Sequence, residues 1–586
     1  MLYNLEDREM AEHKFPNIRD LAIIGDRHTA AIVTTQGEIV WYCPERFDSP
    51  SLLASLLDPE KGGVWTVQSP NLKFARRRYR EDSGVLETTF AGAGSEWHLT
   101  DWMPYDENLP RGLCRWTSAV PNEVTLTLRA APNYARRAPN LRKEGDAVRV
   151  GDRDFLYASH PLIIDGEAVS FTIPPGESGW AMLVNETLSQ PGEAQMKAWL
   201  ETTLENWRKV AARATYTGPY EGQVADSIRV LRLLTFEENG GIIAAATTSL
   251  PEVVGGKRNY DYRYVWLRDA GMIVRALTRA GSDGTEERQF LNYLCGFGCH
   301  SGKKLPLEPF STLDGDAVCD EEILDFVGYR SSSPVRIGNG ARQQLQLDAY
   351  GNVLLAAQLI YNRFETREHW STIERIADYL TEHWRDRDNS FWEEREQYQY
   401  TASKALVACG LEQVARFGEE EQARRWRKTV EEIRHFIADR CLTSEGAYAV
   451  IAGSEAVDVS AALFPIWGYT APDAPEMVAT MKALERDLAT GHLYRRHLEQ
   501  FDSQREGAFL AGTFWVAQYW VMRRDFQRVE KILEAAFEYA NDLGLFAEEA
   551  EPNTGQMLGN FPQTFVHSAF ISTVVELKMA LQQSSM

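Results

Sequence analysis

The spacing of hydrophobic residues divides the chain into two halves. From about residue 20 to 215, hydrophobic and polar positions alternate over short runs, as in VTLTL at 124–128. Alternation with period two is typical of a β-strand with one buried face. The segments AAIVTTQGEIVW at 30–41 and PLIIDGEAVSFTI at 161–173 each predict two strands joined by a turn. We therefore expect an antiparallel β-sandwich in the first half.

Beyond this region hydrophobic residues recur every three or four positions, the period of an amphipathic helix. MKAWLETTLENW at 196–207 is an early example, and roughly a dozen helical windows follow to the C-terminus. AFLAGTFWVA at 508–517 is apolar on more than one face and suits an inner helix, whereas 419–441 suits an outer ring. An inner and an outer ring together make an α/α toroid. Clear windows are 341–364, 401–417, 419–441, 507–522 and 563–581.

The change of period also predicts the domain organisation. We expect an N-terminal β-sandwich domain over residues 1–190, a helical linker over 191–235 and a helical domain over 236–586. A chain of 586 residues is too long for one ordinary core. The segment 301–340 is too long for a simple connector, so we expect it to carry function.

Composition and charge narrow the classes of partner. The net charge of −22 disfavours nucleic acid and anionic membranes, because a polyanion is repelled over most of the surface. Neutral ligands remain, and the 16 Trp include side chains whose flat rings suit sugar faces as well as cores. The sequence is compatible with a homo-oligomer.

The start of the chain and its cysteines indicate a cytoplasmic protein. MLYNLEDREMAEHKFPNIRD is charged and lacks the apolar segment of a secretory signal. The seven Cys are odd in number and widely scattered, as expected for reduced thiols. Cys295, Cys299 and His300 form one local cluster, which is too weak a pattern for a metal site. We predict no metal and no cofactor.

A pair of adjacent carboxylates follows two aromatic rings in NSFWEEREQY at 389–398. One interpretation is a solvated helical turn anchored by Trp392. The other is a general acid, because an apolar wall removes water from the charged carboxylate and raises its pKa. These residues alone leave both interpretations open.

NYDYRYVWLRDA at 259–270 resembles the N-W-D-Y-R-Y-x-W-L-R-D-A signature of glycoside hydrolase family 15, the glucoamylase family. The resemblance covers essentially the whole chain, including a β-domain similar to that of prokaryotic members. It implies an (α/α)6 barrel for the helical domain and hydrolysis with inversion of configuration. Further motifs follow in family order: GYRSSSPVRIGN at 328–339, QLQLD at 344–348, FWEE at 391–394, EGAF at 506–509, GLFAEE at 544–549 and GNFPQ at 559–563.

The resemblance implies the two catalytic carboxyl groups. Glu393, directly after Trp392, corresponds to the general acid, and Glu548 to the general base that activates water. Inverting enzymes hold these groups roughly 6.5–9.5 Å apart to leave room for that water. Taken without the motif, Glu548 would be read as part of an acidic surface turn.

The same resemblance implies a set of sugar-binding residues. Arg268 and Asp269 correspond to the pair that holds the terminal glucose, which closes one end of the pocket and makes cleavage exo-acting. Without the motif, an ion pair at a helix start explains them equally well. Arg495 is assigned by position, and a shift of one residue would replace it by Arg496. The remaining implied binding residues are Tyr262, Trp266, Trp392 and Glu394.

We expect an inverting, exo-acting α-glucoside hydrolase that releases β-glucose from the non-reducing ends of short α-glucans. The alternative within the family is a trehalase, and the alternative of another class is a non-catalytic sugar-binding protein on a hydrolase scaffold. The substrate is a small neutral oligosaccharide or disaccharide. REQY at 395–398 and Ala550-Glu551 after the base depart from the usual family pattern, so linkage and chain-length preference stay open.

Overall fold

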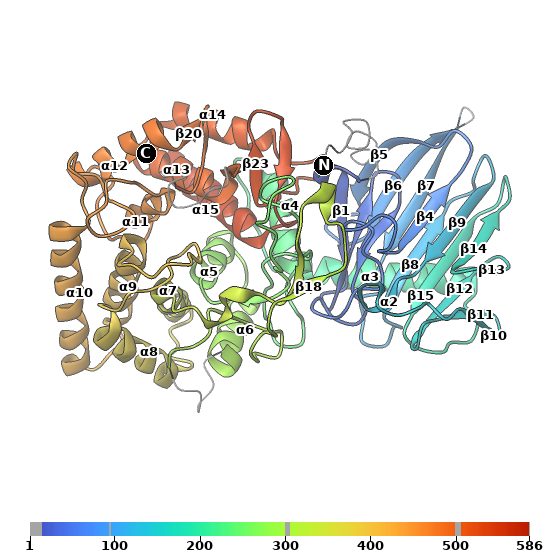
Figure 1. The fold of residues 1–586 in the computed structure, drawn as a ribbon, viewed down its shortest axis with the longest axis horizontal. Helices are drawn as coiled ribbons and strands as arrows, with labels where there is room; N and C mark the ends of the chain where they lie inside the picture. The colour runs from blue at the N-terminus through green and yellow to red at the C-terminus, as the bar shows by residue number, and fades with distance from the viewer. Residues whose placement is uncertain (1–14, 93–94, 299–304, 498–505, 585–586) are drawn as a thin grey trace, which may run out of the picture.

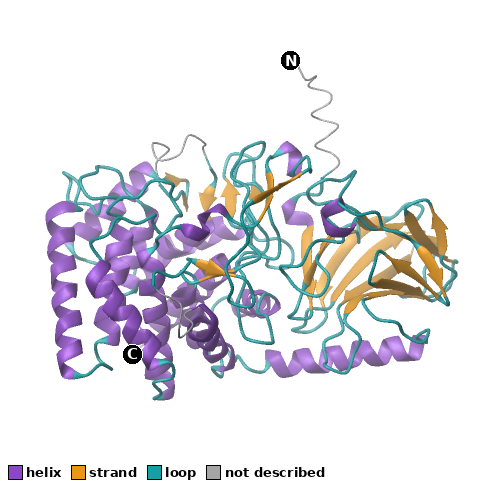
Figure 2. Cartoon of the chain, turned by 60° about the horizontal axis from the view of Figure 1, so that its bottom comes forward, coloured by secondary structure: helices purple, strands orange, loops and turns teal. Residues whose placement is uncertain are grey.

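The computed structural model describes residues 15–92, 95–298, 305–497 and 506–584. Strands gather at one end of the molecule and helices at the other (Figure 1; Figure 2). Two antiparallel sheets form the first part. In spatial order, the seven-stranded sheet contains β1 Leu21–Gly25, β2 Ala30–Thr34, β3 Ile39–Tyr42, β4 Val64–Gln68, β9 Val124–Arg129, β14 Ala168–Ile173 and β13 Ile163–Asp165. The eight-stranded sheet contains β10 Arg142–Glu144, β11 Ala147–Val150, β12 Asp154–Ala158, β15 Gly179–Val184, β8 Gly112–Thr117, β7 Ser95–Trp102, β6 Leu86–Gly92 and β5 Lys73–Tyr79.

The alternating sequence pattern corresponds to the buried faces of these sheets. In β9, Val124, Leu126 and Leu128 are buried while the residues between them are half-buried. Successive strand side chains point to opposite faces, so the apolar set packs into the core. The two predicted strand pairs form as β2–β3 and β13–β14. The β-sandwich prediction is confirmed.

Helix α3 (Glu193–Ala211) belongs structurally with the sheets. Its buried residues Met196, Leu200 and Leu204 pack in one cluster with Trp102 and Trp180 of the eight-stranded sheet. The next helix, α4, packs instead against α15 at the end of the chain. We therefore propose that the barrel begins at α4, inside the segment predicted as a linker.

The helical part is a closed double ring. Each inner helix packs on the next, and the last packs on the first; each outer helix lies against this ring, α12 through the short 3-10 helix Val459–Ala462 that leads into α11. The inner helices are α5 Ala270–Arg279, α7 Leu347–Phe364, α9 Thr401–Val414, α11 Leu463–Ile466, α13 Leu510–Met522 and α15 Thr564–Ser584. The outer helices are α4 Glu221–Leu233, α6 Thr285–Tyr293, α8 Trp370–His383, α10 Glu420–Arg440, α12 Pro475–Asp487 and α14 Phe526–Phe537.

Burial separates the two rings as the sequence predicts. Nearly every residue of α13 is buried, whereas α10 buries a stripe that includes Trp426, Ile433 and Ile437. The (α/α)6 architecture is confirmed. One predicted window is too long: α7 begins only at Leu347, because residues 340–343 form a short 3-10 helix and Gln344 lines a cavity.

Short hairpins and one apolar helix complete the fold. Among the described residues, α15 is long and apolar enough to cross a membrane, but 72% of its most apolar stretch is buried inside the protein. Cys295 is buried, and Cys299 and His300 lie outside the described residues. The short strands are β16 Val265–Trp266, β17 Phe310–Ser311, β18 Glu322–Leu324, β19 Val335–Ile337, β20 Ala489–Thr490, β21 Leu493–Tyr494, β22 Ala508–Phe509, β23 Glu549–Glu551 and β24 Gln556–Leu558.

Candidate active site

A cavity of about 1000 Å³ opens at one end of the barrel. Its lining comes from the segments that precede the inner helices, and Tyr262, Gln344, Glu393, Arg496 and Glu548 are examples. Backbone N–H groups at helix N-termini carry partial positive charge, which favours negative groups nearby. The architecture brings acidic and basic side chains from distant parts of the sequence into one pocket.

In the segment before α5, alternate side chains contact the β-domain and line the cavity. Asp261 and Arg263 form a fully buried ion pair at 2.6 Å, and Arg263 also donates to the backbone oxygen of Ser49 in the β-domain. Tyr260 and Tyr262, at the alternate positions, line the cavity. An extended backbone points neighbouring side chains in opposite directions, so one motif joins the β-domain to the active site.

Glu393 lies in the cavity with its carboxylate held by two donors. Oε1 accepts a hydrogen bond of 2.6 Å from Nε1 of Trp266 and one of 2.9 Å from Nη1 of Arg268. Its backbone has φ of 61°, in the left-handed region that a non-glycine residue rarely adopts. Gln344 donates to the backbone oxygen of Glu393 at 3.1 Å and helps to hold this turn.

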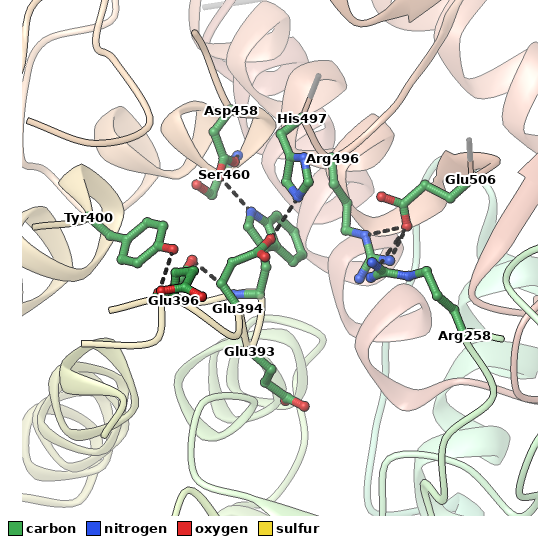
Figure 3. A network of polar contacts seen from close by, with 12 residues as sticks. Arg258, Glu393, Glu394, Glu396, Tyr400, Asp458, Ser460, Arg496, His497 and Glu506 are labelled. Atoms are coloured by element: carbon green, nitrogen blue, oxygen red, sulfur yellow. Dashed lines mark hydrogen bonds and ion pairs between the residues drawn. The ribbon is translucent and has the colours of Figure 1, made fainter. Parts of the chain in front are cut away.

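The left-handed turn sends the two adjacent acids in opposite directions. Glu393 points away from the Glu394–His497 pair (Figure 3). Nε2 of His497 donates to Oε1 of Glu394 across 2.9 Å. The two acids therefore occupy different places in the pocket, although they are neighbours in sequence.

Trp392, which precedes Glu393, makes its polar contact with another acid. Its Nε1 donates to Oδ2 of Asp458 at 2.6 Å, and its ring packs against Phe509 and Trp515. The indole that contacts Glu393 is Trp266, through its N–H rather than its face. The indole N–H of Trp266 thus serves Glu393, whereas that of Trp392 serves Asp458.

Glu548 lies deep in the cavity and is 2% exposed. Oε1 accepts a hydrogen bond of 2.8 Å from the hydroxyl of Tyr262, and Oε2 has no hydrogen-bond partner among the described residues. Burial is the main cause that raises the pKa of Glu548 to about 8, and the charge of Glu252 adds to it. This carboxyl group is poised to hold or release a proton near neutral pH.

Two aromatic residues connect the two candidate catalytic carboxyls. Tyr262 contacts Glu548 and Trp266 contacts Glu393, while their ring centroids lie 5.5 Å apart. Trp266 and Asp269 are not among the residues that line the cavity. They act from behind it: Asp269 binds Nε of Arg268 at 3.0 Å and so orients the guanidinium.

The structure places Arg496, and not Arg495, in the cavity. The backbone N–H of Arg495 donates to the oxygen of Leu488, and its guanidinium donates to Thr490. The prediction for Arg495 is therefore corrected by one residue, because adjacent residues of this extended segment face opposite sides.

Arg496 lies at the centre of a buried charged cluster. Its Nη2 is 2.5 Å from Glu252 and also contacts Glu506, and Glu549 is 3.4 Å away. Arg258 binds Glu252 at 2.5 Å from another side. Three carboxylates come close enough to suit a cation, but guanidinium groups already occupy this place and supply positive charge.

Within this cluster the pKa values of Glu506 and Glu549 shift in opposite directions. Burial opposes ionisation of Glu506, but Arg496 and Arg258 outweigh it and lower its pKa to about 2. Burial and the nearby Glu506 raise the pKa of Glu549. The environment of Glu548 is thus set by residues from three distant segments.

Sequence reasoning missed several residues of the site. Glu252, Arg258 and His497 stand in no position that the family motifs single out, and only their contacts reveal them. Glu506 and Gln344 lie inside the motifs EGAF and QLQLD, and these motifs could have identified them as site residues. Tyr262, Arg268, Trp392, Glu393, Glu394 and Glu548 all line the cavity as expected.

Comparison with known proteins places this site in a family context. A model described as glycosyl hydrolases family 15 matches residues 218–527 and 526–575. A second model, described as trehalase-like, N-terminal, matches residues 9–182. A solved bacterial glucoamylase in complex with acarbose has a TM-score of 0.71 at 12% identity, covering 97% of this chain and 96% of that one. At this identity the likeness concerns the fold.

Curated relatives match over nearly their whole length. Proteins named trehalase from Thermoplasma acidophilum and Mycolicibacterium smegmatis are each 30% identical to this chain. The first match covers 94% of this chain and 98% of the relative, and the second covers 97% and 92%. A trehalase from Thermoplasma volcanium is 29% identical over 97% of this chain and 94% of the relative.

Proposed function

The chain belongs to glycosyl hydrolase family 15, and from this premise we propose that it is a trehalase, which hydrolyses α,α-trehalose to two molecules of glucose. The observation that carries the proposal is the match to proteins named trehalase over 94–97% of the chain. The match of the β-domain to a trehalase-like N-terminal model supports it further. Hydrolysis of short α-glucans, our first expectation, becomes the second candidate.

The proposed mechanism is direct displacement by water with inversion. Glu548 takes a proton from a water molecule as the water oxygen attacks the anomeric carbon, and Glu393 gives a proton to the departing oxygen. Both hydrogen bonds to Glu393 end on Oε1, which leaves Oε2 to carry the proton. Oε2 of Glu548 is buried without a hydrogen-bond partner among the described residues, and the attacking water would supply one.

The binding residues fit a sugar with several hydroxyl groups. Arg268 reaches the cavity and is oriented by Asp269, and charge-assisted donors of this kind hold hydroxyl oxygens directionally. Arg496 takes the role that the motif assigned to Arg495. The polar lining carries acidic and basic side chains together, which suits a neutral substrate rich in hydroxyl groups. A cytoplasmic location remains a prediction.

A substrate panel tests the proposal. We expect trehalose to have the highest kcat/KM among trehalose, maltose, isomaltose, nigerose, kojibiose and maltotriose. Inversion at one glucose unit of trehalose yields one β- and one α-glucose, so NMR should show equal initial amounts. Faster hydrolysis of maltose or maltotriose would favour the second candidate, and an initial product that is all α-glucose would contradict inversion.

Variants assign the two carboxyls within the same test. Glu393→Gln and Glu548→Gln should each lower kcat on trehalose by at least about 10²-fold. Fluoride leaves with little help from an acid, so Glu393→Gln should retain hydrolysis of α-glucosyl fluoride while Glu548→Gln should not. Glu420→Gln, on the exposed face of α10 with its side chain 93% exposed, is the matched control and should behave as wild type. Near-normal activity of either active-site variant on trehalose would contradict its role.

A further inference from the structure

His497 is a buried histidine that lies behind the cavity lining, between two carboxylates. Its side chain is 3% exposed, and its Nε2 donates to Glu394, which does line the cavity. Figure 3 shows the imidazole beside Asp458 and above Glu394. None of the catalytic steps described above uses this residue.

The charge around His497 favours the imidazolium form. Burial alone would lower its pKa, but the hydrogen bond to Glu394 and the charges of Asp458, Glu394 and Glu506 outweigh burial and raise it. A protonated imidazole donates from both ring nitrogens and accepts at neither. The contact with Glu394 is then a charge-assisted bond to a half-buried carboxylate, which is stronger than a bond between neutral groups.

Asp458 ties the same histidine to the acid-bearing loop. The backbones of Asp458 and His497 pair as an antiparallel bridge. Asp458 Oδ2 accepts from Trp392 Nε1 at 2.6 Å, and Oδ1 accepts from the N–H of Ser460 at 2.6 Å. The loop that carries Glu393 and Glu394 is therefore anchored on both sides of Glu393, through Trp392 to Asp458 and through Glu394 to His497.

We propose that His497 is a positioning residue that fixes the carboxylate of Glu394 on the leaving-group side of the cavity. The inference rests on the proposed function, in which Glu393 protonates the departing oxygen. Glu394 follows Glu393 but points away from it toward His497 (Figure 3). It is therefore placed to accept a hydroxyl of the departing sugar, while the glucose that is attacked lies nearer Glu548 and Arg268.

A substrate without a sugar leaving group separates positioning from a general structural role. α-Glucosyl fluoride fills the site of the attacked glucose and places no sugar beside Glu394. His497→Leu should lower kcat/KM for trehalose by about 10- to 100-fold, the range for a lost bond to a charged group. The same variant should keep its kcat/KM for the fluoride within about threefold of wild type.

A conservative variant and a double variant sharpen the test. His497→Gln places an amide donor near the position of Nε2 and should recover part of the trehalose activity. Glu394→Gln should reproduce the loss seen in His497→Leu, and the double variant should be no worse than the poorer single variant, because both act through one contact. Thermal unfolding of each variant checks that the fold is kept.

Several outcomes would overturn the inference. They are an equal loss on both substrates, no loss on trehalose, no recovery in His497→Gln, or additive losses in the double variant. Failure of the wild type to hydrolyse trehalose would contradict the proposed function alone. The His497 test would then use the disaccharide of the panel that is hydrolysed fastest, with the same comparison to the fluoride.

Discussion

Glu548 shows how one carboxyl group takes its properties from distant neighbours. Its neighbours in the chain are Ala547 and Glu549. Its pKa, however, is raised mainly by burial and then by the charge of Glu252, which lies almost three hundred positions earlier. Tyr262 and Arg496 act in the opposite direction, through a hydrogen bond and a positive charge. The balance leaves a proton on this group over much of the pH range below about 8.

The pH dependence of kcat/KM reports this balance. A general base must be ionised, so kcat/KM should rise with pH until Glu548 is deprotonated. Because its pKa is about 8, well above the ordinary 4.5, we expect the rise to continue past neutral pH. The measurement is kcat/KM for α-glucosyl fluoride from pH 4 to 10, with fold stability checked at each pH, because hydrolysis of the fluoride does not also require a protonated Glu393. A rise that is complete near pH 5 would contradict this assignment.

Two variants should move the acidic limb of that profile in opposite directions. Glu252→Gln removes a charge that raises the pKa of Glu548, so the limb should shift to lower pH. Tyr262→Phe removes the hydrogen bond that lowers this pKa, so the limb should shift to higher pH. Shifts of the same sign would indicate that another group controls the profile.

The hairpin of β23 and β24 sets the position of the base from behind. Gly559 follows β24 with φ of 76°, and a Cβ there would lie 2.6 Å from both Cβ and Oε2 of Glu548. The N–H of Gly559 donates to the oxygen of Pro251 at 2.8 Å, so this backbone has little freedom to move away. Only glycine lets the hairpin pass so close to the carboxylate.

Substitution of Gly559 should therefore damage catalysis more than folding. Gly559→Ala should lower kcat on trehalose by about 10-fold or more, since a displacement of about 1 Å at a reacting group has effects of that order. Gly555→Ala is a close control: this glycine, in the same hairpin, has φ of 73° but nothing within 4 Å of an added Cβ. Both variants carry the same backbone strain, so only the first should lose kcat.

Equal losses in the two glycine variants would mean that backbone strain alone explains the effect. Equal unfolding temperatures with unequal kcat would support the close approach to Glu548. The comparison needs only steady-state kinetics on trehalose and thermal unfolding.

The β-domain and the barrel meet at the same motif that faces the substrate. Arg263 lies within 5.7 Å of the rings of Trp41 and Tyr134, both in the β-domain, and donates to Ser49. Nε1 of Trp41 donates across the interface to the oxygen of Ala246 at 2.8 Å. The β-domain thus supports the active site although it supplies no catalytic carboxyl.

Breaking the interfacial ion pair should affect both stability and catalysis. Arg263→Met leaves Asp261 buried without its partner and should destabilise the protein by about 3–5 kcal/mol. It should also lower kcat/KM, because the segment holding Tyr262 loses its anchor. Urea unfolding and kinetics on trehalose measure the two effects. An Arg263→Met protein with wild-type kcat/KM would show that the β-domain contact does not support the site.

Arg115 offers the comparison that separates these effects. It pairs with Asp101 at 2.8 Å, and both side chains are as buried as those of Arg263 and Asp261. This pair lies within the eight-stranded sheet, away from the cavity. Arg115→Met should therefore lose a similar amount of stability while its kcat/KM on trehalose stays unchanged below the unfolding transition.

The sequence by itself determined the fold class and the two candidate catalytic carboxyls. The alternation in β9 and the apolar faces of α13 indicate which side chains are buried. The spacing of residues within one strand or helix decides which side chains lie on the same face. Glu393 and Glu548 were predictable because they stand inside recognisable motifs. Family membership follows from these motifs and from the match over the chain.

Tertiary structure alone decided which neighbours surround each acid. His497 beside Glu394, Glu252 near Glu548, and Arg496 in place of Arg495 all depend on contacts between loops far apart in sequence. The hydrophobic period of one element does not indicate which residue of another element faces it across a cavity, because the same period is found whatever that residue is. The physical reason is that periodicity reflects the geometry of one element, whereas charge balance in a buried site is set by packing among all of them.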